Sequence, residues 1–128
     1  MKDLKKLALW TESRYLFLLA YQLSESFPHN EADSLTRQIQ NSCAEILALM
    51  LHGFSEIKAN EPYRFLQLAK RYVNNLEKQL AKAYKNNYLN DSDFVHLIKG
   101  TREIMRMLTS FILKLKADEK IPIKGEKE

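Results

Sequence analysis

Apolar residues recur along most of the chain at the three- and four-residue spacing of one face of an α-helix. The pattern is clearest over residues 61–88, where one side is apolar and the other is polar. The apolar arc of this segment comprises Phe65, Leu68, Ala69, Tyr72, Val73, Leu76, Leu80 and Ala83. This segment is therefore predicted to be an amphipathic helix that buries one side.

Three further helices are predicted, at about 8–27, 33–54 and 91–116. The apolar arc of the first comprises Leu9, Leu16, Phe17, Leu19, Ala20, Leu23 and Phe27. That of the second comprises Leu35, Ile39, Cys43, Ile46, Leu47, Met50 and Phe54, widened by Leu49 and Leu51. Both arcs are wider than packing within one bundle requires, so part of each is expected to contact another subunit.

Breaks in the pattern separate these helices. Pro28 ends the first and opens a polar connection, Gly53 marks the approach of the second connection, and Asn90 is placed to cap the fourth helix. Residues 1–7 are expected to lie loosely over the end of the bundle, and the charged segment 117–128 is expected to be a mobile tail.

Composition agrees with a helical protein of one domain. The chain has 128 residues, and its three glycines and three prolines provide little material for the turns of a sheet protein. Short connections between four amphipathic helices favour an all-α, antiparallel up-down-up-down four-helix bundle. The apolar runs are too short for a secretion signal or a membrane span, so a soluble, cytoplasmic protein is expected, without membrane contact.

A basic stripe runs along the polar side of the segment 61–88. Arg64, Arg71, Lys78 and Lys85 recur every seven residues, with Lys82 beside them. The fourth helix adds Lys99, Arg102 and Arg106, interrupted by Glu103. If the third and fourth helices are adjacent, these eight residues form a surface for the phosphates of RNA or DNA, although a solvated helix face would have the same pattern. The net charge of +4 permits such a partner without requiring it.

Residues that would support catalysis are not grouped in the sequence. His29 is expected in a loop, and His52 and His96 occur singly on polar faces, without a second ligand at metal-binding spacing. The only cysteine, Cys43, lies on an apolar arc and is expected to be a buried thiol. The chain is therefore predicted to be no enzyme and to use no metal or cofactor. A small-molecule or metal site inside the bundle is a third functional alternative, without a buried polar cluster to support it.

With the helices placed, the chain resembles the four-helix-bundle proteins encoded in intervening sequences of bacterial 23S rRNA genes. The shared stretches, spread over about residues 9–115, are LALW, FP, LTRQI, HGF, YRFLQLA, LEKQL and YLNDSDF. Their order and spacing carry the resemblance. It implies an antiparallel bundle, a homopentameric ring and no established enzymatic activity, with nucleic acid as a suspected partner.

Departures from that family make a related branch a competitor. After LTRQI, Gln40 and Asn41 occupy positions where the family usually has arginines, and the second helix is more apolar. This moves the chain toward the accessory variability proteins of diversity-generating retroelements, which are similar basic pentamers that assist a reverse transcriptase. Two functions therefore compete: an oligomeric nucleic-acid-binding scaffold, and a protein-interaction subunit of a reverse transcriptase.

Overall fold

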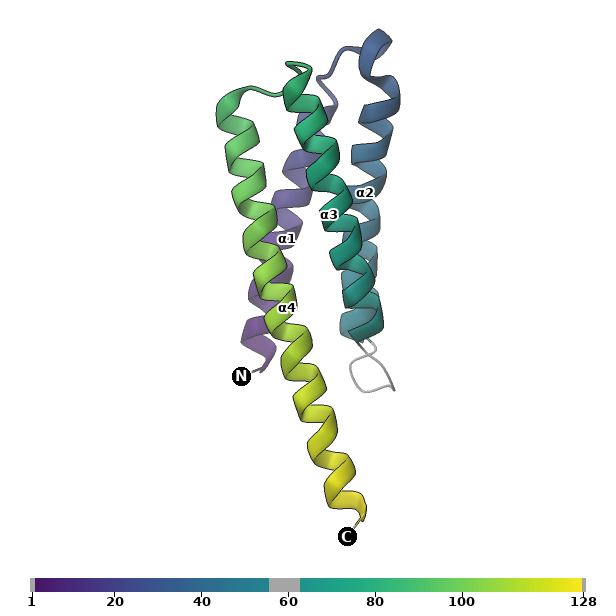
Figure 1. The fold of residues 1–128 in the computed structure, drawn as a ribbon, viewed down its shortest axis with the longest axis vertical. Coiled ribbons are helices and arrows are strands. Elements are labelled where there is room, and N and C mark those ends of the chain that lie inside the picture. Colours follow the sequence, from purple (N-terminus) through teal and green to yellow (C-terminus); the bar gives the residue numbers. More distant parts are fainter. Residues whose placement is uncertain (1, 56–62, 128) are drawn as a thin grey trace.

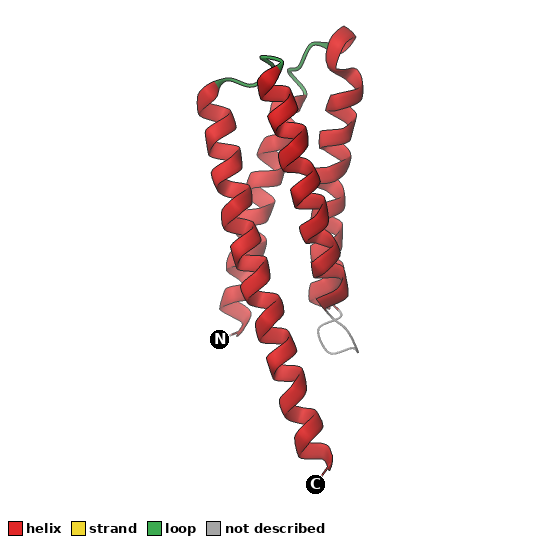
Figure 2. Ribbon diagram, in the orientation of Figure 1, coloured by secondary structure: helices red, strands yellow, loops and turns green. Residues whose placement is uncertain are grey.

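Four helices make up the part of the chain that the structure describes. The computed structural model describes residues 2–55 and 63–127, with the side chains of residues 4–55 and 63–118. The helices are α1 (Lys2–Ser24), α2 (His29–Ser55), α3 (Tyr63–Lys85) and α4 (Asp91–Lys127), and the described residues contain no strand (Figures 1 and 2). The expectation of an all-α chain of four helices is confirmed.

Each helix packs mainly against two others. Close backbone contacts join α1 to α2, α2 to α3, α3 to α4, and α4 back to α1. Across one diagonal, side chains meet in the core, since the rings of Phe54 of α2 and Phe111 of α4 are in contact. Figure 1 shows the α1–α2 and α3–α4 connections at the same end of the molecule, and the last turns of α4 projecting beyond the other end. Helices α3 and α4 are therefore neighbours, as the proposed basic surface requires.

The core is formed by the apolar arcs of all four helices. Phe17 of α1, Ile46 of α2, Leu76 of α3 and Leu108 of α4 are among its fully buried members. The predicted arc of α1 is used inside the bundle, since its residues are buried or half-buried. The large apolar side chains that stay exposed on α1 and α2 lie outside the predicted arcs, except for Leu51 of α2. The others are Leu4, Leu7, Tyr15, Leu18 and Tyr21, all of α1.

Helix limits near Pro28 differ from the prediction. Helix α1 begins at Lys2 and ends at Ser24, not at 8 and 27, and α2 begins at His29 rather than at 33. A residue that precedes proline is disfavoured in the helical conformation, so the chain leaves α1 through a turn before Pro28. The carbonyl of Pro28 then accepts the Ala32 N–H at 2.9 Å, which places the expected polar connection in the first turn of α2. His29 is accordingly helical and not in a loop.

The core face of α3 includes a residue that the predicted arc omits. Leu66 is fully buried, whereas Leu68 of the predicted arc is 36% exposed. The core face of α3 is therefore rotated toward Leu66 relative to the predicted arc. Gly53 of α2 leaves room for the Leu66 side chain, because a Cβ atom added at Gly53 would lie 2.7 Å from Leu66 Cδ2. Gly53 is a helical residue of α2 that lets α3 approach closely, and α2 continues past it to Ser55.

The connection from α3 to α4 is built from local hydrogen bonds. Asn87 has a positive φ of 66°, its N–H donates to Tyr84 O, and the Tyr88 N–H donates to Ala83 O at 2.9 Å. This is a Schellman motif, which ends α3 at Lys85 instead of at 88. The Asp93 N–H donates to Asn90 Oδ1 at 2.7 Å, so the predicted cap of α4 is confirmed. Residues 61 and 62 of the predicted third helix lie outside the described residues.

The C-terminal segment differs in secondary structure from the prediction. Helix α4 continues to Lys127, so the residues expected to form a tail are helical in the described chain. Residues 117–120 include alanine, glutamate and lysine, which favour the helical state, and continuing an existing helix avoids the cost of nucleating a new one. The N-terminal residues expected to lie loosely likewise belong to α1 from Lys2 onward.

Candidate nucleic-acid interface

The basic stripe of α3 lies on the side of the helix that faces away from the core. Arg64, Arg71, Lys78, Lys82 and Lys85 are all exposed, as expected from their seven-residue spacing opposite the buried positions. Arg64 already takes part in an interaction within the protein. The other four present their charges to solvent along the last two-thirds of α3.

Helices α3 and α4 are held together beside this stripe. The Thr101 hydroxyl donates to Glu77 Oε2 at 2.6 Å, and the rings of Tyr84 and Phe94 stack with their centroids 4.2 Å apart. Thr101 is fully buried, so the Glu77 carboxylate is oriented toward α4. These two contacts fix the rotation of each helix relative to the other.

A groove of about 590 Å³ runs along this contact. It is lined by Asn74, Glu77, Lys78, Ala81, Phe94, Ile98 and Arg102. Lys78 comes from the stripe of α3 and Arg102 from the patch of α4, so the fold brings one cation of each set to the same groove. Glu77 also lines this groove, and its carboxylate reduces the positive charge there.

The other two cations of the α4 patch do not join this groove. Lys99 is exposed but is not among the lining residues. Arg106 forms an ion pair with Glu103 and lines a separate groove between α1 and α4. The predicted surface is therefore only partly continuous, with Lys78 and Arg102 as its junction.

Sequence reasoning missed the aromatic component of the interface. Phe94 is half-buried, lines the groove and stacks on Tyr84, which is 36% exposed. The Tyr84 hydroxyl donates to Asp91 Oδ1 at 2.7 Å, and this hydrogen bond raises the pKa of the phenol above its usual value. A neutral aromatic pair beside cations can stack on nucleic-acid bases.

Histidines and acidic residues do not assemble into a metal site within the described chain. His52 stacks on Phe65 with a centroid distance of 4.3 Å, and His96 Nε2 lies 3.1 Å from the Tyr15 hydroxyl. No group of three or more His, Cys, Asp or Glu side chains suited to a metal ion occurs among the described residues. Among the described residues, no helix is long and apolar enough to cross a membrane.

Cys43 is a core residue, as predicted. Its side chain is 1% exposed, and burial raises the pKa of the thiol from 9.0 to about 12. As the pH rises, the Cys43 thiol therefore loses its proton at a lower pH in the unfolded chain than in the folded protein. The stability linked to the protonated thiol is fully present below pH 9 and is lost between pH 9 and 12.

This linkage is measurable with Cys43→Ala. The substitution removes the titrating group, so its destabilising effect is expected to be smaller at pH 10 than at pH 7 by about 1.4 kcal/mol. Urea unfolding of both proteins at the two pH values gives the difference, in which the shared titration of lysines and tyrosines cancels. An equal effect at both pH values would contradict a thiol that stays protonated in the folded state.

Comparison with known proteins identifies the family of the chain. No curated protein matches the sequence. The family described as 23S rRNA-intervening sequence protein matches residues 5–110, which is more than half of the chain and includes α2 and α3 completely. The chain belongs to the 23S rRNA-intervening sequence protein family.

Proposed function

We propose that this protein is a non-enzymatic, cytoplasmic binding protein that contacts the phosphate backbone of RNA or DNA through α3 and α4. The observation that carries the proposal is the groove in which Lys78 and Arg102 lie beside Phe94. Cations supply affinity for phosphates, and the aromatic ring offers a surface for a base. The family name adds a link to rRNA genes and names no enzymatic activity.

The length of the exposed stripe suits several phosphates of one strand. Arg71 and Lys85 are separated by four helical turns, or about 21 Å at 1.5 Å per residue. Phosphates of one DNA strand follow at about 3.4 Å along the helix axis, so this distance corresponds to about six of them. Four exposed cations along such a path should contact about four phosphates, which predicts a slope of about −3 to −4 in a plot of log K against log salt.

Oligomerisation is part of the proposal. We infer an antiparallel up-down-up-down bundle and a homopentameric ring as its assembly. The bundle topology is supported by the α1–α2 and α3–α4 connections at one end, and by the end of α2 and the start of α3 at the other (Figure 1). Exposed apolar side chains such as Leu7, Leu18 and Leu51 support self-association, because such surfaces gain stability when covered. A ring would repeat the basic groove, and several weak contacts to one nucleic acid would then add through effective concentration.

A protein partner is the competing function. A shallow surface on α1, lined by Trp10, Thr11, Arg14, Tyr15, Leu18, Leu19 and Gln22, combines apolar and aromatic side chains. Such a surface favours a protein contact, either with another copy of the chain or with a larger enzyme such as a reverse transcriptase. In the second case the basic face of α3 and α4 would assist that enzyme in holding its template.

Fluorescence anisotropy with labelled single-stranded RNA, double-stranded RNA and double-stranded DNA tests the proposal. Binding at low salt that weakens along the stated slope is expected for at least one of them. Light scattering on the same samples gives the mass of the free protein and of the complex. Absence of binding to all three at low salt would reject nucleic acid as the partner, and binding insensitive to salt would reject the phosphate contacts. A monomer would remove the contribution of multivalency.

A further inference from the structure

A second groove lies between α1 and α4, away from the basic stripe. It has a volume of about 270 Å³ and is lined by Lys5, Ala8, Leu9, Arg106, Met107, Ser110, Phe111 and Lys114. Leu9 and Phe111 are buried core residues, and the ring of Phe111 is held edge-on against Phe54 at 5.8 Å. The apolar floor of the groove is therefore part of the rigid core.

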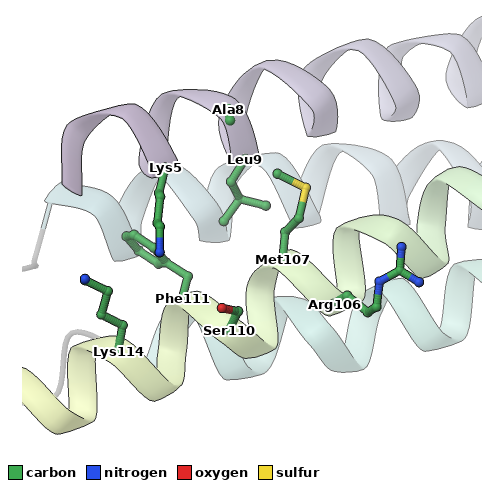
Figure 3. Close-up of a pocket in the computed structure, with 8 residues that line it drawn as sticks. All are labelled: Lys5, Ala8, Leu9, Arg106, Met107, Ser110, Phe111 and Lys114. Atoms are coloured by element: carbon green, nitrogen blue, oxygen red, sulfur yellow. The ribbon is translucent and has the colours of Figure 1, made fainter. Parts of the chain in front are cut away.

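The rim of this groove carries positive charge at both ends. Figure 3 shows Lys5 of α1 and Lys114 of α4 at the end near Phe111, and Arg106 at the opposite end. Arg106 is compensated by its ion pair with Glu103. Lys5 and Lys114 have no ion-pair partner among the side chains that the structure describes, and both are exposed. The uncompensated charge is thus concentrated at one end.

We propose that this groove binds a small amphipathic anion, with its apolar part on Leu9, Met107 and Phe111 and its carboxylate or phosphate between Lys5 and Lys114. An apolar cavity of about 150 Å³ is large enough for benzene, so the groove of about 270 Å³ takes a medium-length alkyl chain or a substituted ring. The ammonium groups of the two lysines provide the charge-assisted hydrogen bonds that an anionic head group requires.

The lining of the groove favours a ligand that has both parts. A neutral apolar compound would leave the two ammonium groups without a counter-charge, and a small inorganic anion would leave the apolar floor in contact with water. A molecule that has both features gains from apolar burial and from charge pairing in the same place. This site is independent of the proposed nucleic-acid interface, since none of its lining residues belongs to the groove between α3 and α4.

Octanoate is a suitable probe, with octan-1-ol and acetate as matched compounds that lack the charge and the alkyl chain. Titration of the protein followed by NMR should move the methyl signal of Met107 and the amide signal of Ser110, and leave the buried Met50 methyl unchanged. Octanoate is expected to bind about tenfold more tightly than octan-1-ol, and acetate is expected to cause no shift at Met107.

Two variants locate the binding. Lys5→Glu with Lys114→Glu should weaken octanoate binding about tenfold or more, whereas Lys85→Glu with Lys99→Glu changes the net charge equally and should leave it unchanged. Ala8→Trp, at an exposed position of the lining, should block the groove while both lysines are retained. Circular dichroism confirms that each variant is folded.

Absence of shifts at Met107 and Ser110 with octanoate would overturn the proposal. Equal affinities for octanoate and octan-1-ol would overturn the role of the two lysines. An equal loss of octanoate binding in the two double variants would show a general effect of net charge and would also overturn it.

Discussion

Replacing Arg71, Lys78 and Arg102 with glutamate is expected to weaken RNA or DNA binding by about a hundredfold or more at low salt. Each substitution removes a cation from the exposed face of α3 or from the groove and adds a charge that repels phosphate. The salt slope should fall by about 0.9 for each phosphate contact that is lost. Anisotropy measurements at several salt concentrations give both quantities. All three side chains are exposed, so the fold and the oligomer mass should be unchanged.

A matched control separates this effect from net charge. Lys5, Arg37 and Lys114 are exposed cations outside the groove between α3 and α4, and their replacement with glutamate changes the charge of the protein by the same amount. Binding by this control is expected to remain within about threefold of the original. Equal losses in both triple variants would assign the binding to overall charge. Undiminished binding by the first variant would remove the α3–α4 groove from consideration.

Substitution of Phe17 with alanine is expected to lower the free energy of unfolding by about 3–5 kcal/mol. The side chain of Phe17 is fully buried in the core, so its truncation removes apolar contacts and leaves a cavity. Urea unfolding at a fixed protein concentration measures the loss, since association with other copies also contributes to stability. An unchanged m-value would show that the variant and the original protein expose the same amount of surface on unfolding.

Glu12→Ala provides the comparison within the same helix. Glu12 is exposed, and its replacement should change the unfolding free energy by no more than about 0.5 kcal/mol. If Phe17→Ala cost less than about 1 kcal/mol, its side chain would not be packed in the core as the structure describes.

Much of the fold follows from short-range patterns that can be recognised in the sequence. The cap formed by Asn90 depends on residues close in the chain, and so does the helix stop before Pro28, although its position was predicted a turn too late. Leu66 is absent from the predicted arc of α3 because that arc was drawn from the apolar pattern of this one helix. Its actual core face also depends on the absence of a side chain at Gly53 of α2.

The candidate site also combines features that follow from the pattern of one helix with features that depend on contacts between helices. Exposure of Arg71, Lys78 and Lys85 was predictable, because residues seven apart lie on one face of any helix and the buried positions occupy the other. The role of Phe94 was not predictable, since a half-buried aromatic residue at the edge of an apolar arc has the same sequence pattern as a core residue. Its place in the groove was decided by stacking on Tyr84 of the neighbouring helix.

The amino-acid sequence by itself determined four amphipathic helices, a buried cysteine and a basic side of α3, because each follows from the repeat of a single helix. The tertiary structure alone decided that Arg102 joins Lys78 in one groove while Arg106 lines another with Lys5. Those groupings depend on the rotation of each helix about its axis. That rotation is set by contacts between distant residues, such as Gly53 with Leu66 and Glu77 with Thr101.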